Sequence, residues 1–323
     1  MGNIVVPTIY EYVWFDAFNS PIVVMKNNKY GIVDRFGKQL SPLMYDDMKR
    51  FSNGVIPVRL KNQWGLLNQE AKEVVACIYE EIEVFSEYRG AVKQNGKWGF
   101  IDNKGKLVVP CIYEEVGDFS NGLAPVKVSN QWGYIDTTGA VTIQPQYVSA
   151  KKFCNKLATV KLDNNKFGVI DIKGELVVPA IYDLVIIGKN TIVVEKNKKY
   201  GLLDHQGKEL TPLKYDFAYV FCDSEQTKVM QNNRWGFLDS KGKEIIPIMY
   251  DDVYDYHNGY AAVLLNERIG IIDTKGELVY PISIKASDVL VRYDDNLMFS
   301  IINGVEQYFK ILPDKSIIYF YDK

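Results

Sequence analysis

Residues 97–110 read KWGFIDNKGKLVVP, and the same pattern recurs along most of the chain. It joins an aromatic-Gly pair to an Asp-x-x-Gly turn and then to a Pro. An eighth unit keeps the first Gly but places an aliphatic residue before it, Ile269-Gly270. Because the period is fixed, the chain is predicted to be one array of eight repeats of about 34 residues. The aromatic-Gly pairs lie 33 to 35 residues apart, at Tyr30-Gly31, Trp64-Gly65, Trp98-Gly99, Trp132-Gly133, Phe167-Gly168, Tyr200-Gly201 and Trp235-Gly236.

Two turn signals divide each repeat into three predicted strands. In the cleanest unit, residues 123–128 alternate as a strand and Ser129-Asn130 forms a tight turn. Residues 131–135 return, residues 136–139 turn again, and residues 141–143 form the third strand. Asn tolerates the positive φ of a two-residue hairpin turn, and Gly suits the exit of the second turn. The sequence therefore predicts an all-β fold of tandem three-stranded antiparallel meanders.

The aromatic-Gly pair is interpreted as a structural feature. A Gly inside a strand indicates a bulge or a close backbone approach, and the adjacent ring can bury a large apolar area. Ile269 fills the ring position in the eighth unit, which favours burial of this position over carbohydrate stacking. The predicted core positions are Tyr30, Trp64, Trp98, Trp132, Phe167, Tyr200 and Trp235.

The stretch 97–110 resembles the repeat of the WG-repeat family of bacterial proteins, and residues 119–124 extend the likeness between units. The resemblance covers about residues 4–284. It implies a β-repeat fold and supplies no catalytic motif, because most members have no assigned activity. The second unit departs from the pattern, with Ala71 where other units carry Gly.

Two architectures fit these repeats. The favoured one is an open β-solenoid or superhelix, with residues 1–284 forming eight repeats plus an N-terminal partial one. Residues 285–323 then form a divergent C-terminal repeat or cap, with strands near 297–301, 307–311 and 316–320. The alternative is a closed β-propeller of eight or nine blades. A propeller blade usually has four strands, whereas three are counted here, so the open array is favoured.

Composition excludes some partners. Lys and Arg number 38 against 40 Asp and Glu, which gives a net charge of -2. Nucleic-acid binding is not expected, because phosphate contacts need a basic stripe. No apolar run approaches membrane-spanning length, so no membrane partner is expected either. Residues 1–6 show no signal-peptide pattern, and a cytoplasmic location is expected.

The residues that usually carry chemistry are sparse. His occurs only at His205 and His257, both in predicted turns, and no zinc spacing or phosphate-binding loop is present. The sequence therefore predicts no metal, no cofactor and no enzymatic activity.

The four cysteines fall at two repeat positions. Cys77 and Cys111 share an apolar position, and Cys154 and Cys222 share a position that holds Ser in other units. All four are expected to serve packing in a reduced compartment rather than to form disulfides.

One repeating feature has no packing explanation in the sequence. The residue after the repeat Tyr is acidic in most units: Asp46, Glu80, Glu114, Asp183, Asp216 and Asp251. These residues either form a solubilising edge that blocks edge pairing or an acidic face for a basic partner.

The function expected from the sequence is a non-catalytic scaffold for protein–protein interaction, with an accessory, antitoxin or immunity role as one form of it. The alternative is a glycan- or peptide-binding module, which would need exposed aromatic clusters outside the core positions. The oligomeric state is left open.

Overall fold

The computed structural model is all-β. In the described part of the chain every regular element is a strand, and no helix is long and apolar enough to cross a membrane. Two compact units divide the chain, Met1–Leu176 and Val177–Lys323. The structure describes residue 6 and residues 8–14, 20–222, 225–256, 259–285, 298–302, 305–311 and 317–321.

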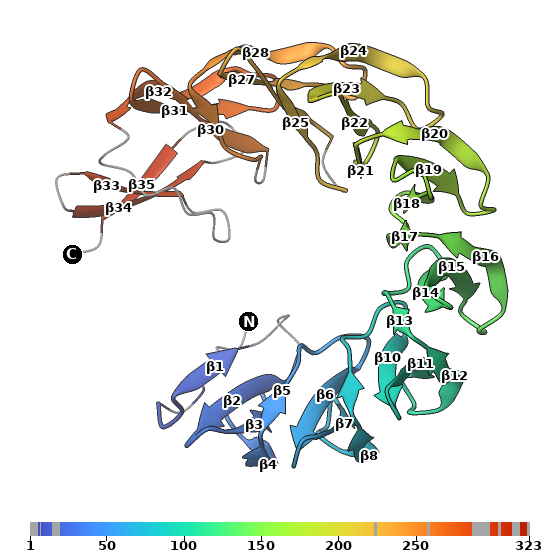
Figure 1. The fold of residues 1–323 in the computed structure, drawn as a ribbon. Coiled ribbons are helices and arrows are strands. Elements are labelled where there is room, and N and C mark those ends of the chain that lie inside the picture. The colour runs from blue at the N-terminus through green and yellow to red at the C-terminus, as the bar shows by residue number, and fades with distance from the viewer. Residues whose placement is uncertain are drawn as a thin grey trace. The chain divides into compact units, whose positions relative to one another are not determined.

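The strands form antiparallel sheets that follow one another along the chain, as Figure 1 shows. Among the described residues there are eight four-stranded sheets and one three-stranded sheet. The strands up to the unit boundary are β1 Tyr12–Trp14, β2 Ile22–Lys26, β3 Lys29–Val33, β4 Gln39–Tyr45, β5 Asp47–Met48, β6 Val55–Leu60, β7 Gln63–Asn68, β8 Glu73–Tyr79, β9 Glu81–Ile82, β10 Arg89–Gln94, β11 Lys97–Asp102, β12 Leu107–Tyr113, β13 Glu115–Val116, β14 Leu123–Val128, β15 Gln131–Asp136, β16 Val141–Tyr147, β17 Ser149–Ala150, β18 Leu157–Lys161 and β19 Phe167–Asp171.

The remaining strands begin at the unit boundary. They are β20 Leu176–Tyr182, β21 Leu184–Ile187, β22 Ile192–Lys196, β23 Lys199–Leu203, β24 Glu209–Tyr215, β25 Phe217–Tyr219, β26 Thr227–Gln231, β27 Arg234–Leu238, β28 Glu244–Tyr250, β29 Asp252–Val253, β30 Tyr260–Leu265, β31 Arg268–Asp273, β32 Leu278–Lys285, β33 Met298–Ile302, β34 Val305–Ile311 and β35 Ile317–Tyr321. The three C-terminal strands predicted from the sequence are present as the three-stranded sheet. The predicted N-terminal partial strand, residues 4–7, lies outside the described residues apart from residue 6.

The prediction of three strands per repeat was wrong. Each repeat sheet gains a short first strand that begins two residues after the repeat Tyr. In the third sheet this strand is β9, two residues long, which pairs Ile82 with Val92 and Glu81 with Lys93. Alternation cannot be recognised in two residues, so the sequence pattern gave no sign of it.

The Gly of the aromatic-Gly pair lies under a bulge in the fourth strand, as predicted. Trp64 is paired with Tyr79 and Leu66 with Val75, so two steps along β7 match four along β8. A Cβ on Gly65 would stand 2.6 Å from the carbonyl oxygen of Val75. Only a residue without a side chain fits beneath this backbone.

The turns have the backbone conformations that their residues predict. Ser129 and Asn130 have φ of 48° and 63°, so both central residues of the first turn are left-handed, as a type I′ hairpin requires. Gly105 has φ of 82° at the exit of the second turn. Ala71 takes that position in the second sheet with φ of 58°.

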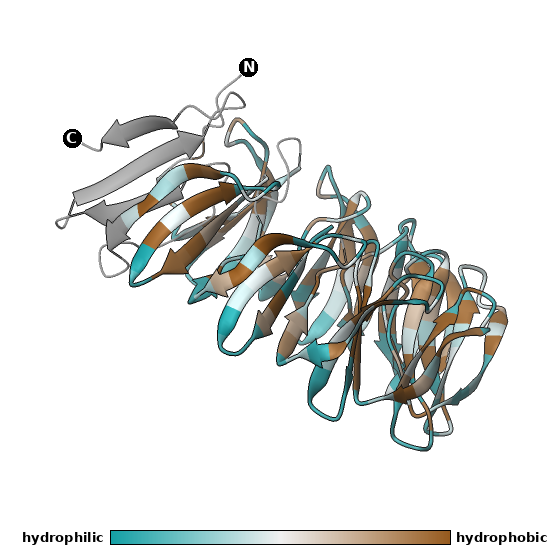
Figure 2. Cartoon of the chain, turned by 90° about the horizontal axis from the view of Figure 1, so that it is seen from above, coloured by the Kyte–Doolittle hydropathy of each residue, from teal (hydrophilic) through white to brown (hydrophobic). Residues whose placement is uncertain are grey.

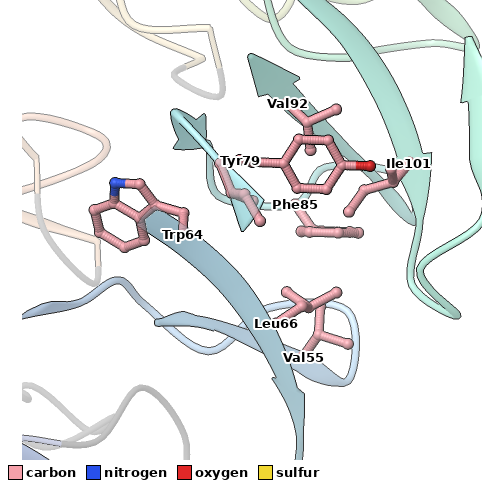
Figure 3. Close-up of a cluster of buried hydrophobic side chains, with 8 residues drawn as sticks. Val55, Trp64, Leu66, Tyr79, Phe85, Val92 and Ile101 are labelled. Carbon is pink, nitrogen blue, oxygen red and sulfur yellow. The ribbon is translucent and has the colours of Figure 1, made fainter. Parts of the chain in front are cut away.

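The core lies between consecutive sheets. Figure 3 shows Val55 and Leu66 of the second sheet pointing toward Phe85 and Ile101 of the third. Leu66 is fully buried, which stabilises the fold by about 1.5–3 kcal/mol. Figure 2 shows that the hydrophobic residues lie mainly in the strands and the hydrophilic residues mainly in the turns.

The repeat Pro lies on the fourth strand, which is at the edge of its sheet. Pro110 in β12 is exposed, and an edge is where a strand tolerates a missing N–H. Among the described fourth strands only β8 lacks Pro, with Ala76 at that position. The Pro therefore protects these edges from pairing with other chains.

The cysteines do not all behave as predicted. Cys77 and Cys111 are free, and burial raises the pKa of each thiol. Cys154 and Cys222 are disulfide-bonded, so the expectation of packing alone was wrong for these two. Spacing along the chain carries no information on which thiols meet.

Candidate functional site

The acidic residues predicted as a binding row lie at the junctions between sheets. Each follows the repeat Tyr at the end of one sheet, and its carboxylate accepts a hydrogen bond from the first turn of the next sheet. Glu114, for example, accepts from the backbone N–H of Asn130 at 3.0 Å. A left-handed turn leaves this N–H without a backbone partner, and a carboxylate is a strong acceptor for it. The acidic position therefore has a structural role that the sequence analysis missed.

The turn residue that is bonded differs between units, and Glu11 accepts from Asn27, the first residue of its turn, at 3.1 Å. Asp46 accepts from Lys61, the first residue of its turn, at 2.7 Å. Glu80 is one methylene longer and accepts from Gly96, the second residue of its turn, at 3.2 Å. The other aspartates bond to the first turn residue, Asp183 to Asn197 at 3.0 Å, Asp216 to Asn232 at 2.7 Å and Asp251 to Asn266 at 2.6 Å.

Three of the aspartates also pair with a cation. Lys29 Nζ lies 2.5 Å from Asp46 Oδ1, and Lys199 Nζ lies 2.6 Å from Asp216 Oδ1. The hydrogen bond from the lysine is the main cause that lowers the pKa of each carboxyl. Asp251 pairs in the same way with Arg234. These three carboxylates are therefore already engaged within the chain.

A second row, not foreseen from the sequence, runs beside the acidic one. The residue before the repeat Tyr is aliphatic in most units and is exposed, although the Tyr itself is buried or half-buried. The exposed fractions are 57% for Ile9, 39% for Met44, 50% for Ile78, 60% for Ile112, 42% for Ile181 and 45% for Met249. Gln146 and Lys214 interrupt the row. The sequence does contain a signal for this row: side chains alternate along a strand, so the residue before a buried Tyr points toward solvent.

The two rows lie on the same side of the fourth strand. Side chains alternate along a strand, so Ile78 and Glu80 both point away from the core, while Tyr79 between them is 7% exposed. Ile112 and Glu114 flank buried Tyr113 in the same way. We call the exposed aliphatic and acidic residues that flank the repeat Tyr, here Ile78, Glu80, Ile112 and Glu114, the outer rim.

The aromatic-Gly rings line the junctions between sheets. Trp64 is 4% exposed, while the other six predicted core rings are half-buried. Trp98 and Trp132 each pack against a core cluster. A cation covers most of these rings, a contact that the sequence analysis also missed. The cation lies 4.9 Å from the ring centre for Lys49 and Trp64, 5.6 Å for Lys93 and Trp98, 6.0 Å for Lys127 and Trp132, 5.2 Å for Lys161 and Phe167, and 4.5 Å for Lys228 and Trp235.

A groove lies beside the first sheet. Its rings are Tyr12 and Trp14 on β1 and Tyr30 on β3, and the opposite wall includes Asp47 and Lys49. The ring centres of Tyr12 and Trp14 are 5.5 Å apart, and those of Trp14 and Tyr30 are 5.7 Å apart. This cluster could not be predicted from the repeat pattern, because Tyr12 and Trp14 precede the first complete repeat.

Neither rim nor groove offers a metal site. Within the described ranges, no group of three or more His, Cys, Asp or Glu side chains could hold a metal ion. His205 Nε2 lies 3.0 Å from the carbonyl oxygen of Gly188, and His257 lies outside the described residues.

The repeats match a known family model. Seven stretches match the model described as WG containing repeat, at residues 30–64, 64–98, 98–132, 132–166, 167–200, 200–235 and 235–268. The chain belongs to the WG-repeat family. Each stretch that matches the WG-repeat model begins at an aromatic-Gly pair and ends near the equivalent position of the next unit. One match therefore covers the third and fourth strands of one sheet and the first two strands of the following sheet. No curated protein matches this WG-repeat chain.

Solved structures match this chain at low sequence identity. One described as the crystal structure of the eukaryotic initiation factor has a TM-score of 0.53 and 11% identity, over 95% of this chain and 96% of that chain. BamB from Moraxella catarrhalis has a TM-score of 0.36 and 8% identity, over 90% of this chain and 96% of that chain. The first likeness concerns the fold alone, and the second is too weak to support an argument.

Proposed function

We propose that this WG-repeat chain is a non-catalytic scaffold that binds a protein partner through its outer rim. The observation that carries the proposal is the exposed aliphatic row, with Ile78 at 50% and Ile112 at 60% exposure on consecutive sheets. Single exposed aliphatic residues are normal on a protein surface, but a row at one repeat position is typical of interaction sites. An accessory, antitoxin or immunity role would be one form of such binding.

The chemistry of the rim suggests the nature of the partner. Aliphatic residues alternate with acidic ones along the fourth strands, so a complementary segment would carry apolar and basic side chains. The apolar contacts would supply most of the affinity, and the acidic residues would guide association and selectivity. An acidic rim disfavours nucleic acid, whose phosphates would be repelled.

The proposal is tested by affinity capture with matched variants. The tagged chain is incubated with lysate of its source cells, and bound proteins are identified by mass spectrometry. The rim variant Ile78→Ser/Ile112→Ser should lose a partner that the wild type retains. The control variant Leu107→Ser/Val141→Ser removes two exposed aliphatic residues from the other end of the fourth strands and should retain it. Absence of any enriched partner, or equal capture by both variants, contradicts the proposal.

A charge-neutral variant separates the two components of the rim. Glu80→Gln/Glu114→Gln keeps an oxygen that can accept from the turn N–H but removes the negative charge. We expect it to weaken capture at low salt and to have little effect at high salt, where charges are screened. Charge reversal is less informative here, because it would also break the turn hydrogen bonds.

We also propose that the sheets continue as an open array, with a closed propeller of eight or nine blades as the alternative. Every sheet among the described residues is made of strands consecutive in the chain, which supports an array without a shared closing sheet. Propeller blades usually have four strands, and each repeat sheet here also has four, so the number of strands no longer favours the open array over the propeller. Small-angle X-ray scattering tests the proposal: a compact chain of this length has a radius of gyration of about 20 Å, and an open array exceeds it.

A further inference from the structure

The first sheet departs from its neighbours at two positions of its inner strand. The second and fourth residues after the repeat Tyr are Asp47 and Lys49 in the second sheet, and Glu81 and Glu83 in the third. In the first sheet both positions are aromatic, Tyr12 and Trp14. The seventh sheet also carries aromatic residues at both positions, Phe217 and Tyr219, whereas in the first sheet the two rings line a groove.

The rings form a continuous platform. Trp14 lies between Tyr12 and Tyr30, with ring centres 5.5 Å and 5.7 Å away. Trp14 and Tyr30 pack partly against the core between the first two sheets, whereas Tyr12 is 54% exposed. The inner part of the platform is therefore held by packing, and the outer part faces solvent.

The platform forms one wall of a groove with a volume of about 690 Å³. This volume lies within the range of about 300–1,000 Å³ that is usual for ligand sites. Met25, Met48 and Val84 add apolar surface to the lining. All of these residues belong to the first unit.

Two charged side chains of the lining, Asp47 and Lys49, are already paired, and Arg50 also lines the groove. Lys49 Nζ lies 2.7 Å from Glu81 Oε1 and 2.8 Å from Glu83 Oε2. Arg59 lies 3.3 Å from Asp47. A charged ligand would have to displace one of these partners, whereas a neutral polar ligand can hydrogen-bond to them as they stand.

We propose that this groove binds a neutral oligosaccharide. The flat, apolar face of a pyranose ring would stack on Tyr12 and Trp14, and its hydroxyl groups would bond to the paired polar side chains around Asp47 and Lys49. A proline-rich peptide also uses aromatic grooves, but its surface offers few donors for the carboxylates of the opposite wall. The site is separate from the outer rim, so it does not depend on the proposed scaffold function.

The experiment titrates the full chain with cellohexaose, maltohexaose, xylohexaose, laminarihexaose and chitohexaose, followed by calorimetry and Trp fluorescence. The test variant Tyr12→Asp/Trp14→Lys introduces the charged pair that the second sheet carries at these positions, so the fold should tolerate it. Tyr88→Asn is the matched control, because Tyr88 is exposed and lies outside the groove. Thermal melting of both variants verifies that they are folded.

We expect at least one hexaose to bind, with affinity reduced at least about tenfold in Tyr12→Asp/Trp14→Lys and unchanged in Tyr88→Asn. The single variant Tyr12→Ala, which alters only the most exposed ring, should also weaken binding. Failure of all five hexaoses to bind at millimolar concentration overturns the proposal. So does binding that both groove variants leave unchanged, or binding of a decaproline peptide without any hexaose.

Discussion

Gly99 and Val109 face each other across β11 and β12 so closely that a Cβ on Gly99 would stand 2.4 Å from the carbonyl oxygen of Val109. The fourth strand bulges at this point, and its backbone fills the space that a side chain would need. The Gly of the repeat is therefore required by the approach of another strand and not by its own φ.

This contact predicts the effect of a single methyl group. Gly99→Ala should lower the free energy of unfolding by about 1–3 kcal/mol, because overpacking against backbone must move a strand. Gly122→Ala is the control, since a Cβ there meets nothing within 4 Å and only the positive φ of 81° opposes it. Chemical denaturation measures both. A smaller loss for Gly99→Ala than for Gly122→Ala would contradict the bulge account.

Ala71 predicts a change in the opposite direction. It occupies a left-handed conformation, with φ of 58°, at the position where other units carry Gly. Ala71→Gly should raise the free energy of unfolding by about 0.5–1 kcal/mol, because the Cβ strain of the left-handed region is removed. The shift in the denaturation midpoint gives the sign of the change in unfolding free energy, provided that this free energy depends equally on denaturant concentration in both proteins. A destabilised variant would mean that the methyl contact with the neighbouring core outweighs the strain.

Asp136 predicts a dependence on pH. Hydrogen bonds from the Thr138 side chain, and then from the backbone N–H groups of Thr138 and Ala140, lower the pKa of its carboxyl. The charged form therefore stabilises the turn above the unfolded-state pKa of about 3.9, and this contribution is lost as pH falls through the lower folded-state value. Carbon-13 NMR titration should give a pKa for Asp136 below 3.9, and a higher value would contradict the hydrogen-bonding pattern.

Asn68 provides the natural comparison for that turn. Its side-chain oxygen accepts from the backbone N–H groups of Glu70 and Lys72, as the aspartates do in other sheets. Asp136→Asn should therefore keep the turn, and the stability advantage of the wild type over this variant should decrease as pH falls below about 4.

The bond between Glu114 and Asn130 predicts a difference between two substitutions. Glu114→Ala removes the acceptor for the Asn130 N–H, whereas Glu114→Gln keeps an oxygen in the same place. Amide hydrogen exchange at Asn130 should accelerate in Glu114→Ala and stay close to wild type in Glu114→Gln. Equal acceleration in both variants would show that charge, and not the hydrogen bond, protects this turn.

Much of the fold could be predicted because local chemistry specifies it. Asn95-Gly96 predicts a hairpin turn, and both residues have positive φ. The position of Gly65 predicts a bulge, and the backbone of Val75 lies there. Each of these signals depends on a backbone conformation that few residue types accept, so the residues reveal it directly.

The features that could not be predicted depend on neighbours in space. The short strand β9 has two residues, too few for any period to be recognised. Glu114 was taken as a surface charge because its partner, the Asn130 N–H, belongs to the next sheet. The platform of Tyr12 and Trp14 was not predicted, because these residues precede the first complete repeat. The repeat pattern was read from Tyr30 onward, so these two positions were not compared with those of the other units.

The most direct test of the scaffold account is the dissociation constant of the captured partner, measured with purified proteins. Ile78→Ser/Ile112→Ser should weaken binding at least about tenfold relative to wild type, because two aliphatic anchors are lost from the interface. Leu107→Ser/Val141→Ser should bind as the wild type does. Equal dissociation constants for the wild type and the rim variant would contradict the assignment of the outer rim as the binding surface.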